Sequence, residues 1–483
     1  MKNPDVIVVG SGAGGAIVAS RLTENPGVRV LLLEAGPDTW PEVPNAVEHV
    51  VAGSGVSEFD WDYSDPLLGA ALPRGRLVGG STAINSSYAL RGQPVDYDGW
   101  GAGWTWQDCL PYFRRLEDDA DFGDAPYHGR GGPIHIARQR PDSAVEESFV
   151  AACLELGHRP LEDLNSPDGL GVGPLPRNIK DGVRQSTLVT YLAAARGRPN
   201  LEIRAGALVD RLLFDGDRVI GVQLGGGEQV LAPRTVLAAG AYNSPQVLLR
   251  SGVGSAEQLR RHGIGLRLDL PEVGRHLTDH AITVFVLNVE GGRPADVVRV
   301  GPTVKFRSRY PGVADDMKLT LFPNGEMLNL PGLIGIHLEI DESYSEGVVE
   351  LRSTAATAAP RIESRLLSDQ RDMDRMIAGI DHMLEIFEAM RDGIQAELLI
   401  PDADTARDPE LLHEFVSKYH STGYHPSGTC RIGHVVDEEC RLLGAQGLWI
   451  ADASVMPSVP RANTNLPTLM VGERVADLVK AAL

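Results

Sequence analysis

Cysteine is scarce in this chain, which has four cysteines among 483 residues. They are Cys109, Cys153, Cys430 and Cys440, and no two of them form a CxxC pair. The spacing therefore indicates neither a zinc site nor a redox dithiol, and we expect no metal. Cys430 and Cys440 could pair in space, but a reduced protein is the simpler interpretation.

Long hydrophobic runs are also missing. No window approaches the roughly 20 apolar residues that a membrane span needs. The apolar run near the N-terminus is short and is broken by glycines, which is not the pattern of a signal peptide. We expect a cytoplasmic protein, peripheral to the membrane only if its reaction is coupled to respiration.

An excess of positive charge is absent as well, since 45 Lys and Arg stand against 65 Asp and Glu, a formal charge of −20. Such a chain lacks the basic surface that binds nucleic acids or anionic membranes, and the partner we expect is a small molecule. The hydrophobic fraction of 43% is ordinary for a globular protein, and the length suits two or three domains.

Residues 5–36 have the pattern of a strand, a turn, a helix and a second strand. Val6–Val9 is an apolar run typical of a strand buried on both faces, and the motif GxGxxG follows it. In this motif Gly10 makes the tight turn, Gly12 lets the backbone approach a pyrophosphate, and Gly15 lets helix and strand pack closely. The helix N-terminus then binds phosphate through unpaired N–H groups and its dipole.

The second strand, residues 28–33, ends at Glu34. A carboxylate at this place accepts both hydroxyls of an adenosine ribose. It favours FAD or NAD over NADP, whose additional phosphate it would repel, but it does not separate FAD from NAD. We expect Ala13, Gly14 and Ala35 to contact the same cofactor.

A second glycine-rich block, residues 74–100, contains Gly79, Gly80 and Ser81, followed by Asn85. From its residues alone, the block could wrap a planar ring or a diphosphate, or be an ordinary surface loop. It resembles the first sequence motif of the glucose-methanol-choline (GMC) family of FAD-dependent oxidoreductases. The resemblance implies FAD as the cofactor and these four residues as part of its site.

Three further segments extend the resemblance. Residues 240–254 resemble the second family motif, residues 270–281 the segment leading out of the flavin domain, and residues 447–479 the C-terminal block. The resemblance is weak from about residue 285 to 340, where the substrate is usually selected, so it transfers the class of activity better than the substrate.

The implied fold class is α/β, with a Rossmann-like FAD-binding domain interwoven with an α+β substrate domain built on an antiparallel sheet. Residues 1–280 belong mainly to the FAD-binding domain, and residues 281–420 form the substrate-binding domain. Residues 421–483 return to the FAD domain and carry the catalytic pair. Short strand-like stretches, IGIHLEI and GVVELRS among them, predict the antiparallel sheet, and residues 368–393 predict a long helix.

Two features depart from the family pattern or refine it. Some members attach the flavin covalently through a histidine just before the asparagine of the first block, but this chain has Ile84 there, so non-covalent FAD is expected. The chain is also short for the family, with the shortening in its substrate half.

A hairpin is predicted within residues 200–227. In the family this hairpin approaches the adenine, which implies that Val209 contacts the cofactor through its backbone.

The resemblance also assigns a catalytic pair. In the family, a histidine in a loop like YHPSGT and a histidine or asparagine after a DAS or DGS turn face the reactive part of the flavin. By motif position these are His425 and Asn463. Histidine is the base whose unperturbed pKa lies near neutrality, and an Asn amide donates to a developing alkoxide without titrating. Tyr424 either lines the substrate pocket or packs within its loop.

The helix expected after Asn463 would place its N-terminus beside the flavin, where a helix dipole favours negative charge. No chemistry is assigned to His276 or His280. The family motif places six C-terminal residues at the cofactor: Asp452, Ala453, Asn463, Asn465, Pro467 and Thr468.

The sequence thus predicts FAD-dependent oxidation of an alcohol CH–OH group to a carbonyl, with a dehydrogenase favoured over an oxidase. The substrate is a small alcohol or a peptide-derived redox carrier, and the electron acceptor is unknown. One alternative is a mycofactocinol-oxidising dehydrogenase of a short actinobacterial branch, passing electrons to a respiratory acceptor. Others are an FAD-containing enzyme like hydroxynitrile lyase, without redox turnover, and an NAD-dependent dehydrogenase, against which the flavin motifs argue.

Overall fold

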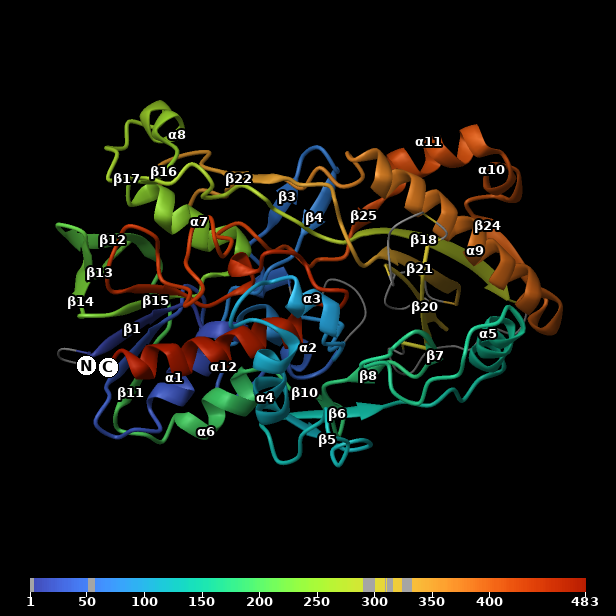
Figure 1. Ribbon diagram of the computed structural model, residues 1–483, viewed down its shortest axis with the longest axis horizontal. Coiled ribbons are helices and arrows are strands. Elements are labelled where there is room, and N and C mark those ends of the chain that lie inside the picture. The colour runs from blue at the N-terminus through green and yellow to red at the C-terminus, as the bar shows by residue number, and fades with distance from the viewer. Residues whose placement is uncertain (1–3, 51–56, 290–299, 309, 311–315, 324–331) are drawn as a thin grey trace.

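The computed structural model describes residues 4–50, 57–289, 300–308, 310, 316–323 and 332–483. A parallel sheet with its helices occupies one half of the molecule, and an antiparallel sheet backed by a long helix occupies the other (Figure 1). Within these described ranges, no helix is both long enough and apolar enough to cross a membrane. All four cysteines are buried and free.

The parallel sheet has the strand order β11-β2-β1-β15-β26. Its strands are β1 (Val6–Val9), β2 (Val30–Leu33), β11 (Leu201–Arg204), β15 (Thr235–Leu237) and β26 (Leu448–Ile450). All neighbours in this sheet run parallel. The residues of β1 are buried throughout, as the unbroken apolar run predicts for a central strand covered on both faces.

Two helices from opposite ends of the chain pack together beside this sheet. They are α1 (Ala13–Leu22) and α12 (Asn465–Ala481), which lie side by side in Figure 1. The close approach depends on glycine, because a Cβ on Gly472 of α12 would lie 2.9 Å from the carbonyl oxygen of Gly14 in α1. The last helix therefore packs against the first helix, beside the parallel sheet.

The antiparallel sheet has the order β24-β18-β21-β20-β19-β7, and β25 also pairs with β18. Its strands are β7 (Gly171–Gly173), β18 (Ala281–Val289), β19 (Thr303–Phe306), β20 (Met317–Phe322), β21 (Ile334–Ile340), β24 (Ala396–Ile400) and β25 (Ser421–Thr422). The predicted long helix is confirmed as α9 (Gln370–Ile394), which Asp369 caps by accepting a hydrogen bond from the backbone N–H of Arg371. Its apolar face packs on the sheet and on α5 (Ala144–Glu155).

The α/β class with an antiparallel substrate sheet is confirmed, with one correction to the strands. The stretch GVVELRS gives β22 (Val348–Glu350), which pairs with β23 (Arg361–Glu363) in a separate two-stranded sheet. The predicted hairpin is β12 (Val209–Asp215) with β13 (Arg218–Leu224). The domain limits stay a prediction, and β7 of the antiparallel sheet comes from the segment assigned mainly to the FAD domain.

Smaller elements connect these layers. The helices are α2 (Asn45–Glu48), α3 (Pro94–Asp98), α4 (Trp106–Leu116), α6 (Ala193–Ala195), α7 (Gly240–Arg250), α8 (Ala256–Arg261), α10 (Ala403–Arg407) and α11 (Pro409–Tyr419). The strands are β3 (Tyr63–Asp65), β4 (Ala70–Leu72), β5 (Glu117–Asp119), β6 (Ile134–Arg138), β8 (Pro176–Arg177), β9 (Ile179–Lys180), β10 (Val183–Arg184), β14 (Gln229–Leu231), β16 (Val253–Gly254) and β17 (Leu268–Asp269).

Candidate active site

A cavity of about 890 Å³ is lined by residues from both sheets. The glycine turn after β1 and Glu34 after β2 contribute to its lining, and so do Glu339 of β21, His425 and Asn463. Pockets of roughly 300–1,000 Å³ are typical of cofactor and small-molecule sites. One continuous cavity therefore includes both the nucleotide motif and the proposed catalytic pair.

The glycines of the first motif fit their predicted roles. Gly10 has φ +92°, and a Cβ on Gly14 would lie 1.7 Å from the carbonyl oxygen of Ala451. A Cβ on Gly15 would lie 2.0 Å from the carbonyl oxygen of Gly10, so this glycine allows helix and strand to pack closely. Gly12 is different, since its Cβ position has only the Cα of Gly80 within 4 Å, at 3.9 Å. It leaves the backbone open to the cavity.

Glu34 lies in the cavity wall and also holds the glycine turn. One carboxylate oxygen accepts hydrogen bonds from the backbone N–H and the hydroxyl of Ser11, and the other accepts one from the N–H of Gly36. Burial raises the pKa of Glu34, and these donors oppose the rise. The oxygen facing Gly36 keeps acceptor capacity for a ligand hydroxyl.

The second glycine-rich block lies directly against the first. Gly80 has φ +51°, and a Cβ there would lie 2.8 Å from the Cα of Gly12. Ser81, Ile84 and Asn85 line the cavity beside it. The two blocks, far apart in sequence, together build a narrow backbone cradle that would not accommodate larger side chains.

The C-terminal residues complete this cradle. Asp452 is buried and lines the cavity, and its Oδ2 accepts hydrogen bonds from the N–H of Gly240 and the hydroxyl of Ser244. Thr464 precedes the first residue of α12 and makes no capping hydrogen bond with its side chain. Gly12, at the start of α1, has no side chain to cap that helix.

These observations fit a bound FAD. The N-termini of α1 and α12 both open on the cavity and keep N–H groups without side-chain caps, which is the arrangement that binds phosphate and other negative charge. A carboxylate at the end of β2 suits the ribose, and the glycine cradle suits a flat or extended group. We infer that the cavity holds the dinucleotide along its length.

His425 and Asn463 meet at the cavity wall. The amide Nδ2 of Asn463 lies 2.9 Å from Nε2 of His425, and the Asn463 Oδ1 is buried without a hydrogen-bond partner among the described residues. With the amide nitrogen as donor, Nε2 is the acceptor and therefore the nitrogen that carries a lone pair. His425 is 7% exposed, so this lone pair is largely shielded from bulk water.

Asp279 fixes the loop that carries His425. Its Oδ1 accepts a hydrogen bond from the backbone N–H of His425 at 2.8 Å, and its Oδ2 accepts one from the hydroxyl of Thr422 at 2.6 Å. The N–H of Gly423 donates to the carbonyl oxygen of His280. This explains how a loop of Ser, Thr, Gly and Pro holds a buried histidine. Tyr424 lines the cavity and has φ +64°, with its ring partly exposed.

Two residues that the sequence left without a role lie behind His425. The Nδ1 atoms of His280 and His425 are 2.9 Å apart, and Oε1 of Glu339 lies 2.8 Å from the first and 3.4 Å from the second. Glu339 also accepts a hydrogen bond from Lys318, which bonds Asp341 as well. A buried carboxylate is thus placed on the side of His425 opposite Asn463.

The charges of this group follow from burial and pairing. Burial disfavours the charge on Glu339, but Lys318 and the two histidines hold its pKa well below the ordinary value. Burial lowers the pKa of His425, and Glu339 only partly offsets this. Burial also acts to lower the pKa of His280, yet Glu339 raises it overall. His425 is therefore neutral, and able to accept a proton, at neutral pH.

Most of the predicted site residues line the one cavity, and the assignment of their roles stays a prediction. Gly15, Gly79 and Pro467 do not line it: Gly15 packs helix on strand, and Gly79 has φ +103° in a turn. The predicted residues that do line it are Gly10, Gly12, Ala13, Gly14, Glu34, Ala35, Gly80, Ser81, Asn85, Val209, Tyr424, His425, Asp452, Ala453, Asn463, Asn465 and Thr468.

Comparison with known proteins defines the class. Residues 7–282 match the N-terminal model of the GMC oxidoreductase family, and residues 343–472 match its C-terminal model. The chain belongs to the GMC oxidoreductase family, and it is an oxidoreductase of the kind that uses FAD and acts on CH–OH donors.

Three relatives show the range of this similarity. A GMC-type oxidoreductase of uncharacterised activity from Mycobacterium tuberculosis is 36% identical over 99% of both chains. An oxygen-dependent choline dehydrogenase from Klebsiella pneumoniae is 33% identical, over 99% of this chain and 96% of that protein. The crystal structure of pyridoxine 4-oxidase from Mesorbium loti is 29% identical, covers 99% of both chains and gives a TM-score of 0.90.

The way in which FAD is held can be tested directly. Ile84 lines the cavity just before Asn85 and offers no nucleophile for a covalent bond to the flavin. We expect acid precipitation of the yellow protein to release all of its FAD into the supernatant. Flavin absorbance that stays with the washed pellet would contradict the prediction and indicate another attachment residue.

Proposed function

We propose that the protein oxidises an alcohol CH–OH group to a carbonyl, with His425 as the base. The observation that carries the proposal is the contact between Nε2 of His425 and Nδ2 of Asn463, 2.9 Å apart in the cavity wall. A base and a neutral donor side by side match the two needs of an alcohol oxygen that loses its proton.

The substrate hydroxyl would replace this direct contact. Its proton would point at Nε2 of His425, and its oxygen would accept a hydrogen bond from Nδ2 of Asn463. As the proton moves to Nε2, negative charge develops on the oxygen, where the Asn463 amide stabilises it. FAD bound in the cavity supplies the acceptor for the hydride that leaves the substrate carbon.

Glu339 orients His425 and stabilises its protonated form in this proposal. A proton on Nδ1 of His425 lies near Oε1 of Glu339, which leaves Nε2 as the lone pair toward the cavity. When Nε2 takes the substrate proton, the imidazolium is positive and the carboxylate at 3.4 Å stabilises it. The second histidine, His280, shares this carboxylate.

Glu339→Gln should therefore weaken the base. Without the negative charge the pKa of His425 falls further, because only burial then acts on it strongly. Since kcat/KM rises as His425 loses its proton, we expect the acidic limb of the pH profile to move to lower pH and the plateau to fall about tenfold. An unchanged limb would exclude this role for Glu339.

Two comparisons make the Glu339→Gln result interpretable. Lys318 keeps Asp341 as a partner at 3.1 Å, so the variant does not leave a buried lysine unpaired. Glu397→Gln, at an exposed position on β24, is the matched control and should leave both the limb and the plateau unchanged. Flavin content measured in both variants separates an effect on the base from a loss of cofactor.

The function itself is tested by mixing the FAD-loaded protein with a panel of alcohols without oxygen and following flavin absorbance. Bleaching by an alcohol supports the proposal, and air admitted afterwards shows whether oxygen accepts the electrons. A yellow protein that no simple alcohol bleaches would contradict simple alcohol oxidation. Bleaching by mycofactocinol would then indicate the redox-carrier substrate, and cleavage of a hydroxynitrile without bleaching would indicate a lyase.

A further inference from the structure

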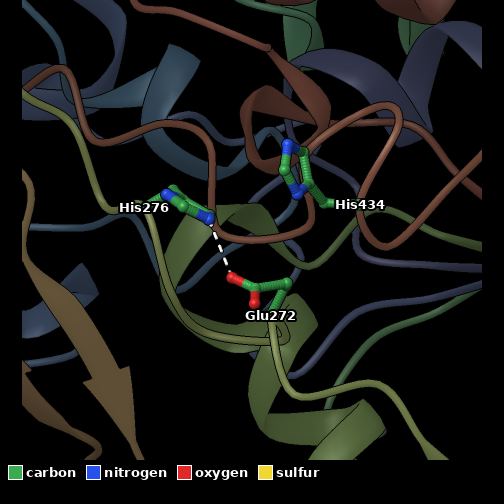
Figure 2. A group of neighbouring side chains, drawn as sticks. All are labelled: Glu272, His276 and His434. Atoms are coloured by element: carbon green, nitrogen blue, oxygen red, sulfur yellow. Dashed lines mark hydrogen bonds and ion pairs between the residues drawn. The ribbon is translucent and has the colours of Figure 1, made fainter.

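We propose that Glu272, His276 and His434 form a binding site for a divalent transition-metal ion, with zinc as the ion that suits their donors. One ligand atom from each residue lies within 4.8 Å of the others. Figure 2 shows the two imidazole rings on opposite sides of a small space, with the carboxylate of Glu272 beneath it. Two imidazole nitrogens and one carboxylate oxygen are a common zinc ligand set with one open position.

The hydrogen bonds of His276 give the first argument. Its Nδ1 lies 2.6 Å from a carboxylate oxygen of Glu346, and its Nε2 lies 2.8 Å from one of Glu272. A neutral imidazole has one N–H, so one of these contacts would set a nitrogen lone pair against a carboxylate oxygen. A metal cation bound by both Nε2 and the Glu272 carboxylate removes this conflict.

Glu346 gives the second argument, because it holds His276 from outside the proposed ligand set. A histidine that binds metal usually donates its other N–H to a carboxylate, which fixes the tautomer and the ring orientation. Glu346 accepts this bond from His276 and is itself held by Arg431 at 3.0 Å. The metal-facing nitrogen is thereby Nε2, the atom that points at Glu272.

His434 gives the third argument. Its ring packs near that of His276, with centroids 5.1 Å apart, and within the described part of the chain its ring nitrogens make no hydrogen bond or ion pair. It is exposed, so its side chain is free to turn. Ligand atoms about 2.0–2.1 Å from a tetrahedral zinc lie roughly 3.3 Å from one another. The three ligand atoms here lie within 4.8 Å of one another, and rotation of the side chains is enough to bring them to the zinc spacing.

The other groups of metal-binding side chains are already satisfied or belong to the catalytic centre. His128 bonds Glu117 and Asp163, and Arg138 bonds Asp119, all in buried positions. The remaining group surrounds His425 behind the active site. Among the described residues, the cluster of Glu272, His276 and His434 therefore combines ligand atoms, an outer carboxylate and access from solvent.

Metal binding here would link the segments that build the catalytic centre. Glu272 and His276 precede Asp279 and His280, and His434 follows His425 on the same segment. Thr278 and Ser427 already connect the two segments through backbone hydrogen bonds in both directions. The ion would add a second connection between these two segments on the solvent side.

The test uses the FAD-loaded protein, freed of metal by a chelator and titrated with zinc alone. We expect one zinc ion per chain and a rise in Tm, because the ion binds the folded protein and not the unfolded chain. His434→Ala and Glu272→Gln should abolish this uptake. Glu346→Gln should weaken it about 10–100-fold, as expected for a residue that orients a ligand.

The controls separate this site from other binding. His413→Ala, at an exposed position on α11, should bind zinc like the unchanged protein, and so should His425→Ala if the ion does not enter the active site. Equal uptake by the His434→Ala and Glu272→Gln variants would place the ion elsewhere and overturn the proposal. No uptake by the unchanged protein would also overturn it.

Discussion

His425→Ala should slow reduction of the flavin by alcohol about 10²–10⁴-fold, the range that a positioned acid–base group contributes. The reason is that Nε2 of His425 is the lone pair next to the Asn463 amide, and burial keeps it unprotonated at neutral pH. FAD should stay bound, because the substitution leaves the glycine turn and Glu34 unchanged. The measurement is the rate of absorbance loss after anaerobic mixing with the best alcohol of the panel.

His413→Ala is the matched control for this experiment, since His413 is exposed on α11. It should bleach at the rate of the unchanged protein. If His425→Ala retains both its FAD and its rate, His425 is not the base, and the neighbouring His280 becomes the candidate. If the variant loses its FAD, the His425 loop is needed for cofactor binding, and the prediction that FAD stays bound is wrong.

Gly14→Ala should destabilise the fold and empty the flavin site. The new Cβ would lie 1.7 Å from the carbonyl oxygen of Ala451, just after β26, so α1 and this strand must move apart. Overpacking of this kind costs typically about 1–3 kcal/mol, and we expect the upper end because the clash is with backbone. Tm and the amount of FAD that copurifies with the protein measure the two effects.

Gly226→Ala tests whether the effect belongs to the position rather than to the substitution. Gly226 does not have a positive φ, and a Cβ there would meet no atom within 4 Å. This variant should keep its FAD and its Tm. A Gly14→Ala protein with normal stability and flavin content would show that α1 can shift without loss, and the close fit would then not be needed for cofactor binding.

Local sequence patterns were sufficient to predict the nucleotide-binding half. The apolar run of β1, the glycine turn and Glu34 after β2 all lie within residues 5–36. Physical rules link this short pattern to the known arrangement of a dinucleotide-binding unit. His425 and Asn463 could be paired only through the family resemblance, because no short-range pattern connects them. Their contact arises from the fold.

Glu339 and His280 were missed for a related reason. In the sequence, the strand IGIHLEI alternates as a half-exposed strand does, so a glutamate in it reads as a solvent-facing residue. In the structure Glu339 lies opposite Lys318 of β20, and the two are buried together beside the histidines. Strand register creates this charge pair, and a single sequence does not reveal register.

The strand order of the parallel sheet has a consequence for how the protein is made. β1 and β2 leave the ribosome early, but the edge strand β26 and the cavity-lining residues that follow it, from Asp452 to the N-terminus of α12, are synthesised only from residue 448 onward. During translation the early strands have an unpaired edge and incomplete cover, a state in which chains aggregate or bind chaperones. The protein can therefore bind FAD only after almost the whole chain has been synthesised. The supply of FAD in the cell then affects completed polypeptides rather than nascent ones.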